Sequence, residues 1–413
     1  MTDQMQANRT ANPSTTDTER DAPGTATADE LLVSSENGPR PTLSVVMPTL
    51  NEEAGVRKCI EQVKSALVEL DVTGEIIVSD SSSDRTPEIA AELGARVVTP
   101  DGMGYGYAYK YAFERARGDY VVIGDADTTY DFEELPKLLE LVREGDADMV
   151  LGSRLDGKIK SGAMPPLHQY VGNPLLTKFL NVFYDAGVSD AHSGFRVIDR
   201  EVLDRLDLRS DGMEFASEMI MEASAKGLRI EEVPITYHER EGEATLDSFR
   251  DGWRHVKFML INAPSYLFSV PGLAFFLFGV LTMALTLADA RLGNATLGIN
   301  SMIAGSLLTI IGFQIATLAV FSSIAADPIK RPRDFITNWI RAKFKLEHGA
   351  SMGLLLYSIG TVYVTLVVAQ WATSGYDTVP FAVRSMVAFT AIVLGTQTIF
   401  SSFFFSMLAQ AQD

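Results

Sequence analysis

The chain has 413 residues, of which 46% are hydrophobic, and a formal net charge of -18. The acidity is confined to one part: residues 1–262 carry 47 acidic and 27 basic side chains, whereas residues 263–413 carry 6 and 8. This division excludes a single soluble globule. It also excludes a nucleic-acid partner bound through a broad basic face, because phosphate neutralisation needs Lys and Arg. The lone cysteine, Cys59, excludes an intramolecular disulfide and a cysteine-based zinc site.

The basic residues are mostly arginine, since only 12 of the 35 are lysine. A carboxylate-rich, lysine-poor surface is typical of proteins that work in high salt, where charges are screened over a few ångströms. The composition therefore predicts a salt-loving source, haloarchaeal in type, and an ordinary acidic protein is the alternative.

Residues 1–40 are rich in Thr, Ala, Asp, Asn and Pro and show no apolar periodicity. Such a composition predicts a disordered acidic tail. The segment lacks the basic start and the apolar stretch of a secretory signal.

Residues 41–244 alternate short apolar runs with helical patterns. The runs predict strands at 43–47, 75–78, 96–98, 120–123 and 148–151, and the patterns predict helices at 53–70, 105–117 and 132–144. Repeated strand–helix units of this length indicate an α/β domain with a mainly parallel sheet. Ligands of such domains bind beyond the carboxyl ends of the strands.

Residues 245–262 show apolar side chains at helical spacing, interleaved with Arg250, Arg254 and Lys257. This pattern predicts an amphipathic juxtamembrane helix with its cations toward lipid phosphates. A plain connector helix is the alternative.

Residues 263–413 contain four apolar stretches, at 264–288, 298–326, 351–373 and 379–409. Each reaches the ~20 residues that cross a bilayer, so we predict an all-α domain of four transmembrane helices. The loop 327–350 carries six basic residues, which places it, the α/β domain and the C-terminus in the cytoplasm. Because no Asp, Glu, Lys or His lies mid-span, the helices are expected to anchor the protein and guide lipid.

The membrane segments also contain a weak internal repeat. Residues 272–279 resemble residues 353–360, and Gly312-Phe-Gln resembles Gly395-Thr-Gln. We interpret these matches as two hairpins of one plan, with chance similarity of apolar segments as the alternative.

The best candidates for chemistry follow predicted strands. Asp125 and Asp127 come directly after the strand at 120–123, where two carboxylates can hold a divalent cation against the phosphates of a nucleotide. An exposed turn is the alternative for such a pair. Pro48-Thr-Leu-Asn-Glu52 follows the first strand, and a Ser/Asp-rich segment containing Asp80 follows the second. The latter can also cap a helix near residue 85.

Taken in chain order, the motifs after the strands resemble those of a known family. Three further motifs continue the same order: Gly152-Ser-Arg154, Ser193-Gly-Phe-Arg196 and Glu232-Val-Pro-Ile235. They are similar to the dolichyl-phosphate (polyprenyl-phosphate) mannose or glucose synthases among the family 2 glycosyltransferases with the GT-A fold. The resemblance covers about residues 43–250.

The resemblance implies a set of site residues. The nucleotide sugar would lie against Pro48, Leu50, Glu52, Asp80 and the Asp125-Ala126-Asp127 motif. Asp125 and Asp127 would hold Mg²⁺ or Mn²⁺. Arg154 would face the acceptor phosphate, Asp190 would lie near the reacting centre, and Arg240 would close on phosphate groups. Catalysis would thus depend on Asp127, Asp190 and Arg154.

Two departures from the family pattern matter. Thr129 stands where relatives often have Gln, so it occupies the place of a third metal ligand. The family's Gly-x-Ser-Lys reads Gly242-Glu-Ala-Thr245, which lacks the acceptor-binding Lys. Arg240, Arg250 or Arg254 would have to substitute for it.

The resulting hypothesis is a membrane-bound, inverting transferase. It moves one hexose from UDP-glucose or GDP-mannose to polyprenyl (dolichyl) phosphate, for protein or cell-surface glycosylation. A processive polysaccharide synthase or a lipid-linked glycan-extending transferase is the alternative, although residues 252–255 lack the processive Gln-x-x-Arg-Trp motif. A non-catalytic membrane scaffold is the third. The sequence leaves the sugar and a homo-oligomer open.

Overall fold

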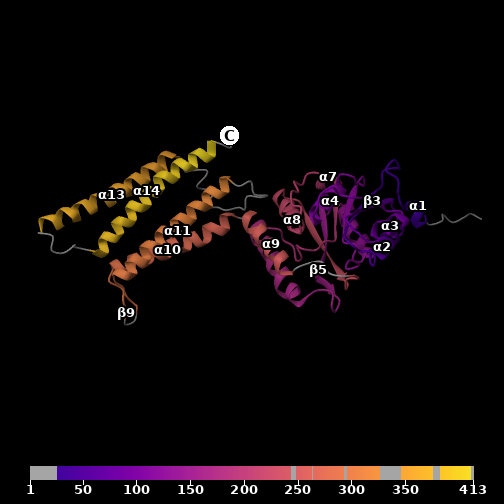
Figure 1. Ribbon diagram of the computed structural model, residues 1–413, viewed down its shortest axis with the longest axis horizontal. Coiled ribbons are helices and arrows are strands. Elements are labelled where there is room, and N and C mark those ends of the chain that lie inside the picture. Colours follow the sequence, from indigo (N-terminus) through magenta and orange to yellow (C-terminus); the bar gives the residue numbers. More distant parts are fainter. Residues whose placement is uncertain are drawn as a thin grey trace, which may run out of the picture.

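The structure is a computed structural model, and it describes residues 26–242, 248–262, 264–292, 295–325, 346–374 and 382–410. Figure 1 shows an α/β domain that is joined through helix α9 (Ser248–Asn262) to a set of long helices. The two parts correspond to the acidic and the apolar halves of the sequence.

The α/β domain is built on one seven-stranded sheet. In spatial order its strands are β3 (Arg96–Val98), β2 (Gly74–Asp80), β1 (Leu43–Thr49), β4 (Tyr120–Ile123), β6 (Arg196–Asp199), β5 (Met149–Ile159) and β7 (Ile230–Tyr237). Neighbours pair in parallel except β6, which runs antiparallel to both β4 and β5. The predicted α/β class with a mainly parallel sheet is confirmed.

Helices cover both faces of the sheet because successive strand residues point to opposite sides. In β1, Val45 and Met47 join one core cluster, whereas Val46 joins the other. The first cluster is covered by α2 (Val56–Leu70), α3 (Thr86–Glu92), η1 (Phe132–Glu134) and α5 (Leu135–Arg143). The second is covered by α4 (Tyr105–Phe113), α6 (Asn173–Tyr184), α7 (Arg200–Leu203) and α8 (Phe215–Ala225). A turn of π-helix, η2 (His168–Gly172), leads directly into α6.

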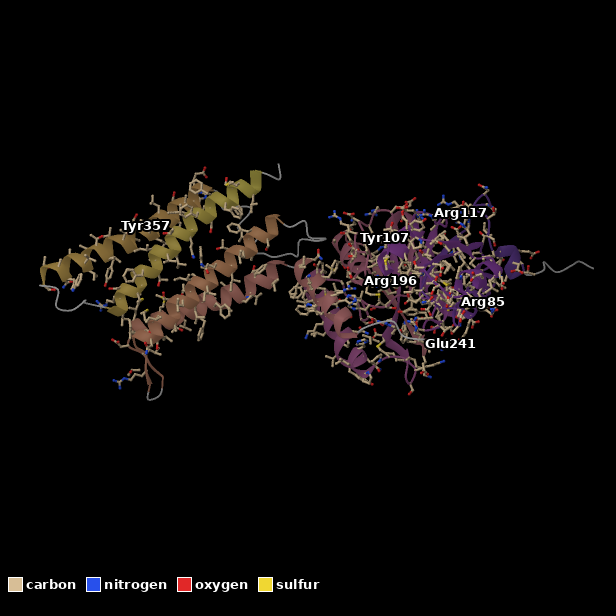
Figure 2. The ribbon with its side chains drawn as sticks, in the orientation of Figure 1. Arg85, Tyr107, Arg117, Arg196, Glu241 and Tyr357 are labelled. Atoms are coloured by element: carbon tan, nitrogen blue, oxygen red, sulfur yellow. The ribbon has the colours of Figure 1, made fainter. Side chains whose placement is uncertain are left out.

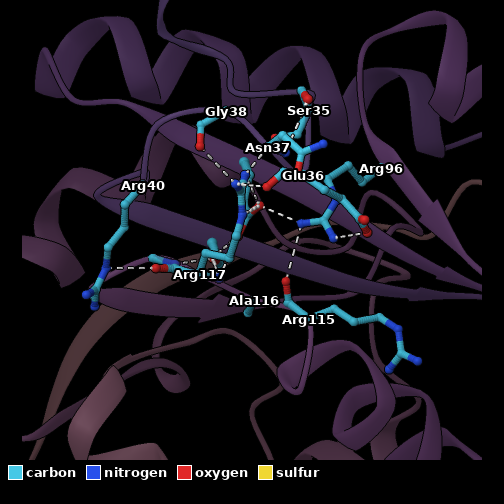
Figure 3. A network of polar contacts seen from close by, with 12 residues as sticks. Ser35, Glu36, Asn37, Gly38, Arg40, Arg96, Arg115, Ala116 and Arg117 are labelled. Atoms are coloured by element: carbon cyan, nitrogen blue, oxygen red, sulfur yellow. Dashed lines mark hydrogen bonds and ion pairs between the residues drawn. The ribbon is translucent and has the colours of Figure 1, made fainter.

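The prediction of disorder up to residue 40 is wrong for residues 26–40. This segment contains α1 (Ala28–Leu31), and Leu31 and Val33 are buried. The Val33 N–H donates to the Gly74 carbonyl at 2.8 Å. Arg117 donates to the carbonyl oxygens of Ser35, Glu36 and Gly38 (Figure 3). Two apolar anchors and one arginine therefore order a segment whose composition reads as a tail; residues 1–25 lie outside the described residues.

Helix α9 packs on the α/β domain with one face. Met259 is fully buried in the second core cluster, and Phe258 packs beside it. The His255 ring meets the His192 ring edge-on at 5.1 Å. Trp253 is exposed. The helix is therefore fixed to the domain and presents its other face outward.

Four helices are long and apolar enough to cross a bilayer: α10 (Pro264–Leu287), α11 (Ile299–Ala325), α13 (Leu346–Thr373) and α14 (Ala382–Gln410). They form two hairpins, α10 with α11 and α13 with α14. The strands β8 (Arg291–Leu292) and β9 (Ala295–Thr296) lie in the connection of the first hairpin. Residues 327–345 of the predicted basic loop lie outside the described residues.

The two hairpins are packed in the same way. A Cβ atom on Gly312 would lie 2.2 Å from the Phe276 backbone nitrogen, and one on Gly395 would lie 2.5 Å from the Tyr357 nitrogen. These residues occupy matching places in the sequence repeat, and Tyr357 is labelled on α13 in Figure 2. Glycine lets the two backbones approach closely at both places. The shared contacts support one plan for both hairpins.

The hairpins meet through their second helices, α11 and α14. The Phe321 and Phe404 rings pack edge-on with centroids 4.7 Å apart, and these residues are equivalent in the repeat. The Ser306 and Thr390 hydroxyls are 2.7 Å apart. Contact between equivalent residues is what two similar units related by an approximate two-fold axis produce.

Candidate active site

The paired carboxylates lie at the carboxyl end of β4, as the sequence predicts. Thr128 between β4 and η1 has a φ of 65°, and this left-handed backbone turns the chain sharply after Asp127. The Thr129 N–H and hydroxyl both donate to Asp127 Oδ1, at 3.1 and 2.5 Å. The Tyr105 hydroxyl donates to Asp125 Oδ1 at 2.9 Å. Thr129 thus fixes the orientation of Asp127, and Tyr105 fixes that of Asp125.

Arg240, which follows β7, joins this group from a distant part of the chain. One guanidinium nitrogen is paired with Glu52 Oε1, and Nη1 lies 3.2 Å from Asp127 Oδ2. The Glu241 N–H donates to the Asp127 carbonyl at 3.2 Å. The segment after β7 therefore lies directly over the Asp-x-Asp turn. Figure 2 labels Glu241 at the edge of the domain.

The carboxyl groups of Glu52 and Asp125 have raised pKa values, because they are buried and lie close to other carboxylates. Burial, followed by the charge of Asp127, raises the pKa of Asp125 to about 7, against the opposing effects of Tyr105 and Arg240. Burial likewise raises the pKa of Glu52 to about 7, against the effect of Arg240. Glu52 Oε2 is buried without a hydrogen-bond partner. The site holds more negative charge than its arginines neutralise.

These residues fit a divalent cation. Mg²⁺ is bound in proteins by one or two carboxylates together with substrate phosphates and water. Within the described residues, no group of three or more His, Cys, Asp and Glu side chains is arranged as a complete protein cage. Asp125 and Asp127 would therefore supply the protein ligands, and a diphosphate would supply others.

The ends of β1 and β2 form one polar edge beside this pair. The Thr49 and Ser82 hydroxyls donate to Asp80 Oδ1 at 2.7 and 2.6 Å. Asn51 has a φ of 59°, and its side-chain oxygen accepts from the Ser83 N–H at 2.9 Å. Leu50, the neighbour of Asn51, is half exposed. The register of β1 and β2 places Pro48 and Asp80 at the same end of the sheet.

The alternative prediction, a Ser or Asp cap on a helix near residue 85, is met only in part, because the N-cap position is Arg85 and its side chain makes no capping hydrogen bond. Asp84 Oδ1 accepts from the Thr86 N–H at 3.0 Å at the start of α3. Asp80 takes no part in that contact, so the first turn of α3 and the polar edge use different carboxylates.

Arg154 and Asp190 form a buried, two-pronged ion pair. Arg154 Nε lies 2.7 Å from Asp190 Oδ2, and Nη2 lies 2.9 Å from Oδ1. The Arg154 backbone N–H donates to the same carboxylate at 3.1 Å. Glu232 on β7 holds the loop in place by accepting from the Ser189 and Asp190 N–H groups. The pairing leaves Nη1 as the Arg154 nitrogen that Asp190 does not engage.

The environment of Asp190 favours a charged carboxylate. Burial alone would raise the pKa of Asp190, but Arg154 outweighs burial through its charge and its hydrogen bonds and lowers the pKa. A carboxylate with a lowered pKa is a weak base. The geometry therefore fits a carboxylate that orients Arg154 better than one that takes up a proton.

The Ser193–Arg196 motif connects the two charged groups. The Gly194 N–H donates to the Tyr130 hydroxyl at 2.7 Å, and a Cβ on Gly194 would lie 3.1 Å from Asp125 Oδ2. Arg196 is fully buried near the middle of the domain (Figure 2). It donates to the carbonyl oxygens of Ala191, Ser193 and Ala216. The sequence identified this motif without its role, which is to hold the loop between Asp190 and Asp125.

Two predicted phosphate-binding residues are less tightly tied to the site. Arg254 lies on α9 and is exposed. The side chain of Arg250, and residues 243–247 just before α9, lie outside the described residues. His255 lies on α9, about one turn after Arg250. The Ser217 hydroxyl is 3.2 Å from His255 Nδ1 and 3.0 Å from His192 Nε2, which is within hydrogen-bonding distance of both. This contact connects α9 to the loop that carries Asp190.

Comparison with known proteins identifies the family of the chain. Residues 44–207 match "Glycosyl transferase family 2", and residues 325–409 match "Glycosyltransferase family 2 C-terminal transmembrane region". The chain is 57% identical over 382 residues to the low-salt glycan biosynthesis hexosyltransferase Agl6 of Haloferax volcanii, covering 92% of each chain. It is 35% identical over 210 residues to a dolichyl-phosphate hexose transferase of the same organism, covering 51% of this chain and 89% of that protein.

Among solved structures, one of glucosyl-3-phosphoglycerate synthase from Mycobacterium tuberculosis contains Mn²⁺, UDP and glucosyl-3-phosphoglycerate. It is 27% identical, with a TM-score of 0.44, and the match covers 58% of this chain and 84% of that chain.

The α/β domain and its site define a glycosyltransferase with the GT-A fold. The chain belongs to glycosyltransferase family 2. It is a multi-pass membrane member of that family, with its transmembrane helices on the C-terminal side of the transferase domain.

Proposed function

We propose that the protein transfers a single hexose from UDP-glucose or GDP-mannose to polyprenyl (dolichyl) phosphate. The observation that carries the proposal is the pairing of an Asp125–Asp127 site with a buried Arg154–Asp190 pair in a domain joined directly to membrane helices. The names of two relatives support the acceptor: the dolichyl-phosphate hexose transferase and an undecaprenyl-phosphate mannosyltransferase of Micrococcus luteus, 31% identical over 216 residues.

On the donor side, the polar edge of β1 and β2 would hold the nucleoside. Pro48, Leu50, Glu52 and Asp80 would line it, with Ala126 below. Asp125 and Asp127 would hold Mg²⁺ or Mn²⁺, with Thr129 orienting Asp127. The cation would neutralise the diphosphate and stabilise it as a leaving group. Arg240 then turns from Asp127 toward the phosphates.

On the acceptor side, the chemistry needs little proton transfer. A phosphate monoester has a second pKa near 6, so it is already anionic near neutral pH. One of its oxygens attacks the anomeric carbon, the bond from that carbon to the diphosphate oxygen breaks, and the configuration inverts. Arg154, oriented by Asp190, attracts and positions the phosphate. Arg250 and Arg254 on α9 add positive charge where the lipid arrives.

The membrane arrangement follows the same logic. The transferase domain, the 327–350 loop and the C-terminus would face the cytoplasm, because basic loops stay there. We assign residues 41–244 to the transferase domain, 245–262 to the juxtamembrane helix and 263–413 to the membrane domain.

A second function has a specific observation in its favour. The name of Agl6 places that relative in glycan biosynthesis without specifying a lipid phosphate. The protein would then add its hexose to a glycan already attached to a lipid. The mass of the product distinguishes the two functions. The first yields one hexose on a prenyl phosphate, and the second yields a lipid-linked glycan that is longer by one hexose.

The experiment is a panel of labelled nucleotide sugars incubated with the purified full chain and polyprenyl phosphate in liposomes with Mn²⁺. We expect one donor to label the lipid. Asp127→Asn should abolish labelling, and Asp146→Asn, on an exposed loop, should not. Full labelling by the Asp127→Asn protein would show that the metal role is wrong. Nucleotide-sugar binding without turnover on any acceptor would favour the third hypothesis, a non-catalytic membrane scaffold.

A further inference from the structure

The outer face of the helix formed by η2 and α6 is apolar and exposed. Leu167, just before η2, is 66% exposed, and Val171, Leu175 and Val182 are 53%, 62% and 61% exposed. Their spacing places them along one face, where Lys178 is the exposed charge. We call these five residues the α6 stripe. The opposite face supplies the core contacts of the helix through Leu176, Phe179, Leu180 and Tyr184.

The charge of this segment differs from that of the surrounding domain. Residues 157–184 contain three lysines and no Asp or Glu, although residues 1–262 contain 47 acidic side chains. An acidic surface suits contact with salt water, whereas a cationic segment suits contact with anionic head groups. A stripe of large apolar side chains with one lysine is typical of a helix that lies in a membrane interface. Lys178 can extend its ammonium group toward lipid phosphates while its stem stays apolar.

The position of the segment fits the same partner. Leu176 and Phe179 of α6 pack in the same core cluster as Phe258 and Met259 of α9. Helix α9 ends at Asn262, and the first membrane helix begins at Pro264. In Figure 1, α6 is the magenta helix directly below α9, on the side of the domain that faces the membrane helices.

We propose that the α6 stripe lies in the head-group region of the leaflet from which α10 enters the membrane. The transferase domain then contacts the bilayer at two places, through α9 and through the α6 stripe. A second contact would fix the tilt of the domain. A domain held at the membrane by α9 alone could still rotate about the axis of that helix.

The stripe also connects to the acceptor side of the site. The Asn181 side chain donates to the Val188 carbonyl and accepts from the Val188 N–H, at 2.7 and 3.0 Å. The Thr177 hydroxyl accepts from the Ala191 N–H at 3.2 Å. The loop carrying Asp190 is therefore held by α6 from both sides. Contact of the α6 stripe with the bilayer would set the height of Asp190 and Arg154 above the membrane surface.

The test uses the full chain in anionic liposomes with one introduced cysteine, at Val171, Leu175 or Val182, labelled with an environment-sensitive fluorophore. Native Cys59 is buried and does not compete for label. Lys137→Cys on α5, whose side chain is 60% exposed, is the matched control. With lipids that carry a shallow quencher, we expect several-fold stronger quenching at the three stripe positions than at position 137.

Quenching equal to that of the control would overturn the proposal. Self-quenching that grows with the ratio of protein to lipid would also overturn it, because it would show that a second copy covers the stripe. The measurement needs neither donor nor acceptor, so it stands or falls independently of the proposed function. A second measurement rests on that function: Leu175→Gln with Val182→Gln should raise KM for a membrane-embedded acceptor several-fold and leave KM for the donor unchanged.

Discussion

The buried Arg154–Asp190 pair allows a quantitative test of the acceptor side. Asp190→Asn removes the charge but keeps the shape, and leaves the guanidinium of Arg154 buried without a counter-charge. Removing one partner of a buried pair costs about 3–5 kcal/mol. For a domain of this size we expect the unfolding temperature to fall by ~10 °C.

The double variant is the informative one. Arg154→Gln alone leaves the Asp190 carboxylate buried and should cost a similar amount. Arg154→Gln with Asp190→Asn removes both charges, so we expect it to be no less stable than either single variant. The coupling free energy would then be roughly 3 kcal/mol. All three variants should lose lipid glycosylation, because none keeps a cation held at the acceptor position.

Thermal unfolding of the detergent-solubilised full chain, followed by circular dichroism, measures the stabilities. Asp204→Asn is the control: its ion pair with Arg200 is exposed, and such pairs contribute about 0–1 kcal/mol. Additive costs of the two single changes would refute the reasoning, since they would show that the two charges do not act on each other. Wild-type turnover by the Asp190→Asn protein would refute the positioning role.

Three further outcomes follow from single contacts. Glu75 is buried; burial alone would raise its pKa, but hydrogen bonds from Ser44, Arg117 and Arg96 outweigh it and lower the pKa. The stability advantage of wild type over Glu75→Gln should therefore be complete above about pH 5 and shrink as the pH falls through the folded pKa, in paired thermal melts. Gly194→Ala should weaken Mn²⁺ binding by about tenfold in calorimetry, because its methyl group would crowd Asp125, with unfolding little changed. Gly312→Leu should destabilise the first membrane hairpin in detergent melts, whereas Gly298→Leu, which has open space around it, should not.

The sequence identified strands where apolar residues run consecutively. The first five strands are of this kind, because helices cover both faces of their sheet, although the edge strand β3 is only partly buried. β6 and β7 were not predicted as strands. β6 is only four residues long and begins with Arg196, whose charge hides the fact that it is fully buried. β7 begins Ile-Glu-Glu, and Glu232 there serves the Asp190 loop rather than solvent.

The part of the candidate site that comes from one short segment could be predicted from the sequence. Contacts between distant segments could not. Asp125 and Asp127 are recognisable from their place after a strand. Arg240, more than a hundred residues away, was expected at the phosphate groups only from the family resemblance, and no local pattern in the sequence indicates its contact with Asp127. The ordering of residues 26–40 escaped prediction for the same reason, since it depends on Arg117 in a distant turn.

The charge of the site indicates how an acidic domain could bind the two anionic substrates of the proposed reaction. Four carboxylates and two guanidiniums converge there: Glu52, Asp125, Asp127 and Asp190 against Arg154 and Arg240. With every group ionised, two negative charges remain, which one divalent cation would balance. Both arginines are paired with carboxylates, so Arg154 would meet a phosphate through Nη1, which Asp190 does not engage, and Arg240 would first have to leave Asp127. The raised pKa values of Glu52 and Asp125 mean that protons take part of this role without the cation. Binding of the cation and the donor should therefore release protons, and the buffer dependence of the calorimetric heat would show it.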